Sequence, residues 1–75
     1  MHQAGKLAEA ERLYRDVLAA EPANVTALHL LGVIRYQQGR QEEALELIAK
    51  ALERQPDFAA ALSNYSLVLK ALKRM

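Results

Sequence analysis

The amino-acid sequence repeats itself with an offset of 34 residues. Lys6 and Arg40 keep their positive charge at this spacing, and other pairs are identical: Gly5/Gly39, Glu9/Glu43, Ala10/Ala44, Leu13/Leu47, Leu18/Leu52, Pro22/Pro56, Ala27/Ala61 and Leu28/Leu62. A fixed period of this length is typical of stacked helical units, because one unit alone cannot bury its apolar face. The sequence therefore predicts an all-α array that offers a surface for partners rather than a catalytic pocket.

Apolar residues recur at the helical i, i+3, i+4, i+7 spacing in four segments. These segments cover residues 6–20, 25–38, 41–54 and 58 to about 73. The connections are short, so we expect consecutive helices to lie antiparallel. The residues expected to be buried are Tyr14, Val17, Leu28, Leu31, Ala44, Leu47, Ile48 and Ala51.

The helix ends are marked by residues with special backbone chemistry. Pro22 and Pro56 follow the first and third helices, because proline disfavours helical geometry in the preceding residue and lacks an amide hydrogen. Gly39 is expected to end the second helix in a left-handed conformation. Asn24 and Asp57 are expected to cap the second and fourth helices.

Composition bounds the class of protein. The 75 residues are 52% hydrophobic and 25% charged, which fits one small helical domain over residues 1–75. The chain has no cysteine, so disulfides and thiolate ligands are excluded. The net charge of +1 gives no reason to invoke nucleic acid or a lipid surface. Without a visible signal peptide or long apolar run, we expect a cytoplasmic protein.

Candidate catalytic groups are few. The best pair is His29 with Ser63, which occupy equivalent places on two neighbouring helices, but we find no acid placed to orient the imidazole. Glu42 and Glu43 are adjacent on a helix and point about 100 degrees apart. We therefore expect no enzyme activity, no cofactor and no metal site.

The residues at the matched positions resemble the tetratricopeptide repeat. Leu28-x-x-Leu31-Gly32 is followed by Ala44-x-x-x-Ile48 and Pro56, in the order of that family's motif. Departures from the motif are Leu28 for the usual Trp, Arg35 for the usual Tyr, and Tyr65 and Ser66 for Leu and Gly in the third unit. The resemblance implies that residues 5–23 form the second helix (B) of one repeat. Residues 24–57 then form a complete repeat and residues 58–75 the first helix (A) of the next, giving the order B-A-B-A in about two repeats.

In this family the A helices line a concave groove, so the resemblance implies a protein-interaction scaffold that binds an extended peptide. The implied peptide-binding residues are Thr26, His29, Tyr36, Ser63, Asn64 and Lys70; Leu30, Val33, Gln37, Ala60, Leu67 and Ala71 also point inward. Asn64 stands where an Asn grips the peptide main chain in arrays of bacterial proteins similar to O-linked N-acetylglucosamine transferases. A substrate-presenting appendage of such a glycosyltransferase is the alternative function. An RNA-binding helical repeat is a third reading, which expects a strongly basic groove.

Self-association is expected from the two terminal helices. Each lacks the neighbour that the repeat order would give it, so each is expected to expose an apolar stripe. The expected stripes are Leu7, Tyr14 and Leu18 at one end and Tyr65, Val68, Leu69 and Leu72 at the other. Two arrangements follow, a head-to-tail chain and a twofold pairing of the closing helices.

Overall fold

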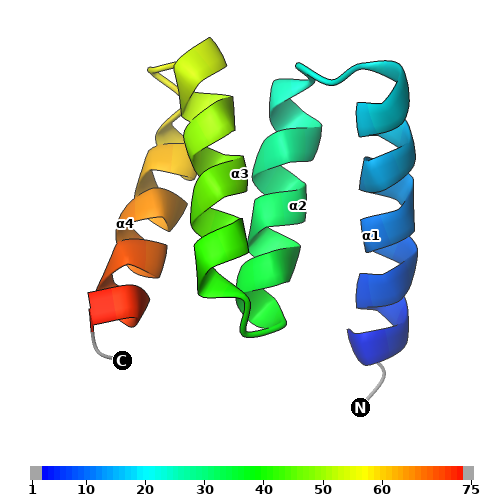
Figure 1. Ribbon diagram of the computed structural model, residues 1–75, viewed down its shortest axis with the longest axis horizontal. Coiled ribbons are helices and arrows are strands. Elements are labelled where there is room, and N and C mark those ends of the chain that lie inside the picture. The colour runs from blue at the N-terminus through cyan, green and yellow to red at the C-terminus, as the bar shows by residue number, and fades with distance from the viewer. Residues whose placement is uncertain (1–2, 74–75) are drawn as a thin grey trace.

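The computed structural model describes residues 3–73, and these form a single helical array. Its helices are α1 (Gln3–Ala20), α2 (Val25–Gln37), α3 (Gln41–Arg54) and α4 (Ala59–Lys73), and Figure 1 shows them side by side in chain order. No strand occurs within residues 3–73. The all-α class is thus confirmed. None of these helices is long and apolar enough to cross a membrane.

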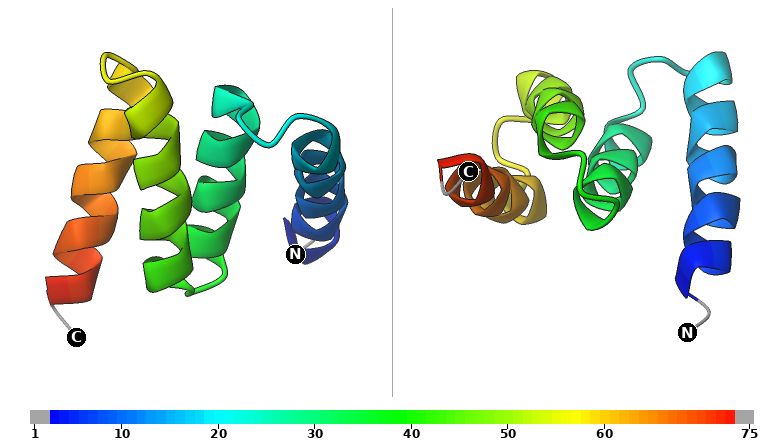
Figure 2. Two further views of the ribbon diagram at one scale, coloured as in Figure 1. Left: turned by 45° about the horizontal axis from the view of Figure 1, so that its top comes forward. Right: turned by 60° about the horizontal axis from the view of Figure 1, so that its bottom comes forward.

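Helix α3 forms one layer of the α2–α3–α4 group, and α2 and α4 form the other (Figure 2). Helix α3 packs on both α2 and α4, which also touch each other, and the right view of Figure 2 shows α3 on one side with α2 and α4 on the other. Helix α1 packs on α2 alone. Both views in Figure 2 show that α1 runs in a different direction from the other three helices. The core therefore lies within the α2–α3–α4 group.

Backbone hydrogen bonds explain where α2 begins and ends. The Asn24 side chain accepts a hydrogen bond from the Ala27 amide at 2.9 Å, which satisfies a free donor of the first turn. At the other end Gly39 has φ of 82°, and the Arg40 amide donates to the Arg35 carbonyl at 2.8 Å. This hydrogen bond from Arg40 back to Arg35 closes the C-terminal end of α2. It requires a left-handed conformation at Gly39, which glycine adopts without strain. Both predicted roles are confirmed.

The predicted cap at Asp57 is wrong by one residue. Helix α4 begins at Ala59, so the residue that precedes it is Phe58, whose carbonyl accepts from the Leu62 amide at 3.0 Å. Asn24 occupies the equivalent place before α2, 34 residues earlier. Phenylalanine has no side-chain acceptor, so α4 begins without the cap that α2 has.

Helices α2 and α3 approach each other closely at Gly32. A methyl group added to Gly32 would lie 2.7 Å from Ile48 Cγ1 and 3.2 Å from the Ala44 carbonyl oxygen. Ala44 and Ile48 are themselves fully buried, and Ala61 and Val68 of α4 pack in the same cluster. The absence of a side chain at Gly32 thus lets α2 and α3 approach closely enough to exclude solvent.

The predicted core is correct in α2 and α3 and only partly correct elsewhere. Leu28, Leu31, Ala44, Ile48 and Ala51 are at most 5% exposed. Tyr14, Val17 and Leu47, which we also expected to be buried, are half-buried. For the two residues of α1 the reason is that this helix contacts α2 alone, so a single neighbour covers its apolar side.

A polar cluster joins α1 to the rest of the fold. The Arg35 guanidinium lies 3.1 Å from the Glu11 carboxylate of α1 and 3.8 Å from the Glu43 carboxylate of α3. Gln38 donates a hydrogen bond to Glu11 at 3.0 Å. The hydrogen bonds from Gln38 and Arg35 hold the pKa of the Glu11 carboxyl below its usual value. Arg35, one of the departures from the family motif, therefore links three helices.

We predict that Ala44→Leu destabilises the fold. Ala44 is fully buried beside Gly32, so the added carbons have no space and the unfolding free energy should fall by about 1 to 3 kcal/mol. Ala8→Leu on the exposed side of α1 is the matched control, and it should change stability by less than about 0.5 kcal/mol. Urea denaturation followed by circular dichroism measures both, and equal effects would contradict the packing described.

Candidate peptide-binding face between helices α2 and α4

The two A helices, α2 and α4, are joined by a buried histidine. His29 is 6% exposed, and its Nε2 lies 2.8 Å from Nδ2 of Asn64 on α4. The Phe58 ring packs edge-on against the imidazole, with ring centroids 4.8 Å apart. In the neutral tautomer with a bare Nε2, the Asn64 amide donates to the ring. This hydrogen bond links α2 and α4 directly.

Burial controls the protonation of His29. Removal from water disfavours the imidazolium and lowers the pKa of His29 from its ordinary value. A protonated ring would also carry an N–H donor at Nε2, and this donor would face Nδ2 of Asn64, which is itself a donor. Both effects keep His29 neutral near pH 7 and suit it to the hydrogen bond it makes.

The structure divides the predicted peptide-binding residues into two groups. Thr26, Ser63 and Lys70 are exposed. His29 and Asn64 contact each other, and Tyr36 packs partly buried against the core cluster. His29 and Ser63 do not share an environment, because one is buried and the other is exposed. Peptide contacts by any of the six stay a prediction.

An apolar depression lies between the two helices beside Asn64. The residues that line it are Val33, Tyr36, Ile48, Asn64, Leu67 and Val68. Its free volume is about 10 Å³, which is about the room that one water molecule needs. Leu67 on its rim is 47% exposed. A partner side chain could therefore pack on Leu67 at the surface without entering the core.

The charge of this face differs from what the sequence suggests. Residues 24–40 contain two basic residues, Arg35 and Arg40, and no acidic residue. Arg35 instead points to Glu11 and Glu43, and Arg40 pairs with Glu43 at 3.4 Å. Among the predicted peptide-binding residues, exposed positive charge comes from Lys70.

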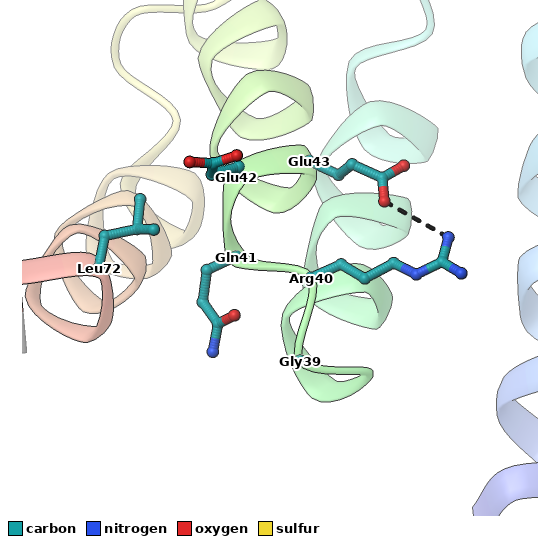
Figure 3. A pocket seen from close by; sticks show the side chains of 6 residues that line it. All are labelled: Gly39, Arg40, Gln41, Glu42, Glu43 and Leu72. Carbon is teal, nitrogen blue, oxygen red and sulfur yellow. Dashed lines mark hydrogen bonds and ion pairs between the residues drawn. The ribbon is translucent and has the colours of Figure 1, made fainter. Parts of the chain in front are cut away.

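A second hollow, of about 330 Å³, lies where α3 begins and α4 ends. Figure 3 shows its lining residues, which are Gly39, Arg40, Gln41, Glu42, Glu43 and Leu72. Arg40 and Glu43 form an ion pair within it, and Leu72 supplies the apolar side. These lining residues include no hydroxyl, thiol or imidazole, so they do not form a nucleophile with a base.

Two contacts of the site could not be anticipated from the spacing of residues. The packing of Phe58 on His29 joins positions on different helices, and no local pattern links them. The ion pairs of Arg35 with Glu11 and Glu43 likewise join positions on different helices. Only the Arg35 contacts have a signal in the sequence, which is the presence of Arg35 at an inner position of the family motif. A charged residue at such a position requires a partner.

Comparison with known proteins agrees with this architecture. The tetratricopeptide repeat family model matches residues 1–72. Human tetratricopeptide repeat protein 7A is 33% identical over 67 residues, which are 89% of this chain and 8% of that protein. The chain therefore belongs to the tetratricopeptide repeat family, whose members generally serve as non-catalytic protein-interaction modules. It spans about one twelfth of the length of this curated relative.

We predict that His29 makes the fold weaker in mild acid. Because its pKa is lower when folded than when unfolded, its contribution is complete above about pH 6.5 and is lost as the pH falls through the folded pKa. Melting temperatures measured by circular dichroism between about pH 7.5 and 5.5 should fall less steeply in His29→Gln. His2→Gln is the control and should retain the wild-type slope; an unchanged slope in His29→Gln would contradict the assignment.

Proposed function

We propose that this chain binds an extended segment of a partner protein across the face formed by α2 and α4. The observation that carries the proposal is Leu67, which is 47% exposed beside the depression that includes Val33 and Asn64. A protein interface combines an apolar centre with a polar rim, and Leu67 beside Val33 and Asn64 offers both kinds of contact. Family membership supports the same class of function.

The chemistry of the face suits a peptide main chain. Asn64 uses Nδ2 for His29, and within residues 3–73 its Oδ1 has no hydrogen-bond partner. This oxygen can accept a backbone N–H from a bound segment. Because the hydrogen bond to His29 already orders the Asn64 amide, that side chain loses little conformational entropy when a segment binds.

The remaining exposed groups favour a neutral or acidic partner segment. Thr26 and Ser63 add hydroxyl groups, and Lys70 adds one positive charge. A single lysine supports a preference in charge without dictating a sequence. We therefore propose that the chain acts as a non-enzymatic interaction module. A cytoplasmic location stays a prediction. The alternative role as a substrate-presenting part of a glycosyltransferase stays a prediction.

We predict that peptides selected from a display library will contact this face. Titration with a selected peptide should shift the NMR signals of Thr26, Ser63, Asn64, Leu67 and Lys70. Asn64→Ala should weaken binding by about 0.5 to 1.5 kcal/mol, the net value of one hydrogen bond. Leu67→Ser should also weaken it, and this variant leaves the His29–Asn64 contact intact.

Lys50→Ala provides the control, because Lys50 is exposed on the third helix, away from the proposed face. Its affinity for the selected peptide should equal that of the wild type. Shifts confined to Glu42, Glu46 and Lys50 would place binding on the opposite surface and contradict the proposal.

A further inference from the structure

The α1–α2 junction differs in geometry from the α3–α4 junction, although both join a B helix to the following A helix. The two connecting turns are alike: the Asn24 amide donates to the Glu21 carbonyl at 3.0 Å, and the Phe58 amide donates to the Gln55 carbonyl at 3.1 Å. Figure 2 nevertheless shows α1 turned away from the direction that α3 and α4 share. The two junctions therefore differ in something other than the turn.

Polar side chains occupy the α1–α2 junction where leucines stand at the α3–α4 junction. The polar residues are Glu11, Arg35 and Gln38, and the residues 34 positions later are Leu45, Leu69 and Leu72. Leu45 and Leu72 pack partly buried against the core cluster. Glu11 instead meets the Arg35 guanidinium at 3.1 Å and the Gln38 amide at 3.0 Å. Charge thus replaces apolar contact between α1 and α2 at these positions.

The apolar stripes expected for self-association are only partly exposed. Val68, which the sequence placed on the stripe of α4, is 1% exposed because it packs in the core. The other residues of the two stripes are half-buried: Leu7, Tyr14, Leu18, Tyr65, Leu69 and Leu72. Self-association through them stays a prediction. On α1, half-burial of the apolar residues means that apolar packing holds this helix only in part, so its ion pair matters more.

Both ions of the Glu11–Arg35 pair have another polar partner on their own side of the junction. Arg15 of α1 lies 3.4 Å from the Glu11 carboxylate. Arg35 lies 3.8 Å from the Glu43 carboxylate and donates a hydrogen bond to Oε1 of Gln38 at 2.9 Å. Breaking a buried ion pair is ordinarily costly because it leaves a charge unpaired. Here α1 and α2 can separate without leaving either charge alone.

We propose that Glu11 and Arg35 form an electrostatic latch, which closes α1 on α2 and opens while the α2–α3–α4 group stays folded. Within residues 3–73, α1 touches α2 alone and adds no residue to the buried cluster at the centre of the core. Elements with few buried contacts open locally before the whole fold does. Because packing between units sets the curvature of a repeat array, opening would change the angle between the first unit and the second. This inference does not depend on the proposed peptide binding.

Hydrogen exchange of the full 75-residue chain tests the latch. Glu11→Gln keeps the shape of the side chain and removes its charge, so the amide protection factors of α1 should fall at least about fivefold while those of α3 stay unchanged. Arg15→Gln is the matched control, because it removes the other ion pair of Glu11 and leaves the latch intact. It should change α1 protection by less than about twofold. Equal effects of the two variants, or an equal loss of protection in α3, would overturn the proposal.

A leucine version of the junction provides a second test. The triple variant Glu11→Leu, Arg35→Leu and Gln38→Leu copies the residues of the α3–α4 junction. Apolar replacement of a whole buried ion pair is often neutral or stabilising, so α1 should stay protected at least as well as in the wild type. Raising sodium chloride from about 0.1 to 1 M shortens the screening length from about 10 to 3 Å and should lower α1 protection in the wild type only. The same salt dependence in both proteins, or a loss of protection confined to α1 in the triple variant, would contradict the latch.

A distance measurement follows the movement of α1 directly. The chain has no cysteine, so spin labels can be attached at Ala8→Cys on α1 and Lys50→Cys on α3, where both side chains are exposed. Double electron–electron resonance should give one narrow distance distribution in the labelled protein and a second population once Glu11→Gln is added. Arg15→Gln should leave the distribution unchanged. An identical distribution with and without Glu11→Gln would show that the ion pair does not hold α1 in place, and it would overturn the proposal.

Discussion

The close approach of α2 and α3 at Gly32 is the contact on which the rest of this fold depends. Gly32 has no Cβ, so Ile48 and the Ala44 backbone fill the space that a side chain would need. That approach buries Ala44 and Ile48 completely and gives α4 an apolar surface to pack on through Ala61 and Val68. The spacing between α2 and α4, bridged by His29 and Asn64, follows from their shared contact with α3.

Equivalent residues have different burial because their neighbours differ. Ala44, Ile48 and Ala51 of α3 are completely buried, and their counterparts Ala10, Tyr14 and Val17 on α1 are half-buried. Since α3 lies between two helices and α1 contacts one, the number of neighbours rather than the residue type sets the burial. This is the nearest-neighbour behaviour of repeat proteins, in which stability comes from interfaces between units. The polar link from Arg35 to Glu11 supplements the small apolar contact of α1.

The sequence predicted the helices and their register well because both depend on local signals. The 34-residue period, the cap at Asn24 and the left-handed Gly39 need no knowledge of distant contacts. The prediction of Asp57 as the cap of α4 was wrong because sequence signals locate a helix start only to within a residue or two. In the structure Phe58 is the residue that precedes α4. The candidate site was harder to predict. His29 could be placed on the side facing α4, but its burial by Phe58 and its bond to Asn64 depend on side chains from another helix. The ion pairs of Arg35 could not be predicted for the same reason, since its acidic partners lie on α1 and α3.

The stability of Gly32→Ala, compared with that of Ser66→Ala at the equivalent exposed position, tests the central role of the α2–α3 contact most directly. Replacing glycine inside a helix by alanine ordinarily adds about 1 kcal/mol of stability. Here the new methyl would meet Ile48 Cγ1 at 2.7 Å, a core atom that cannot move freely. The account predicts that the unfolding free energy falls in Gly32→Ala and rises slightly in Ser66→Ala. A gain of about 1 kcal/mol in Gly32→Ala would contradict it, because the two helices would then have space to spare.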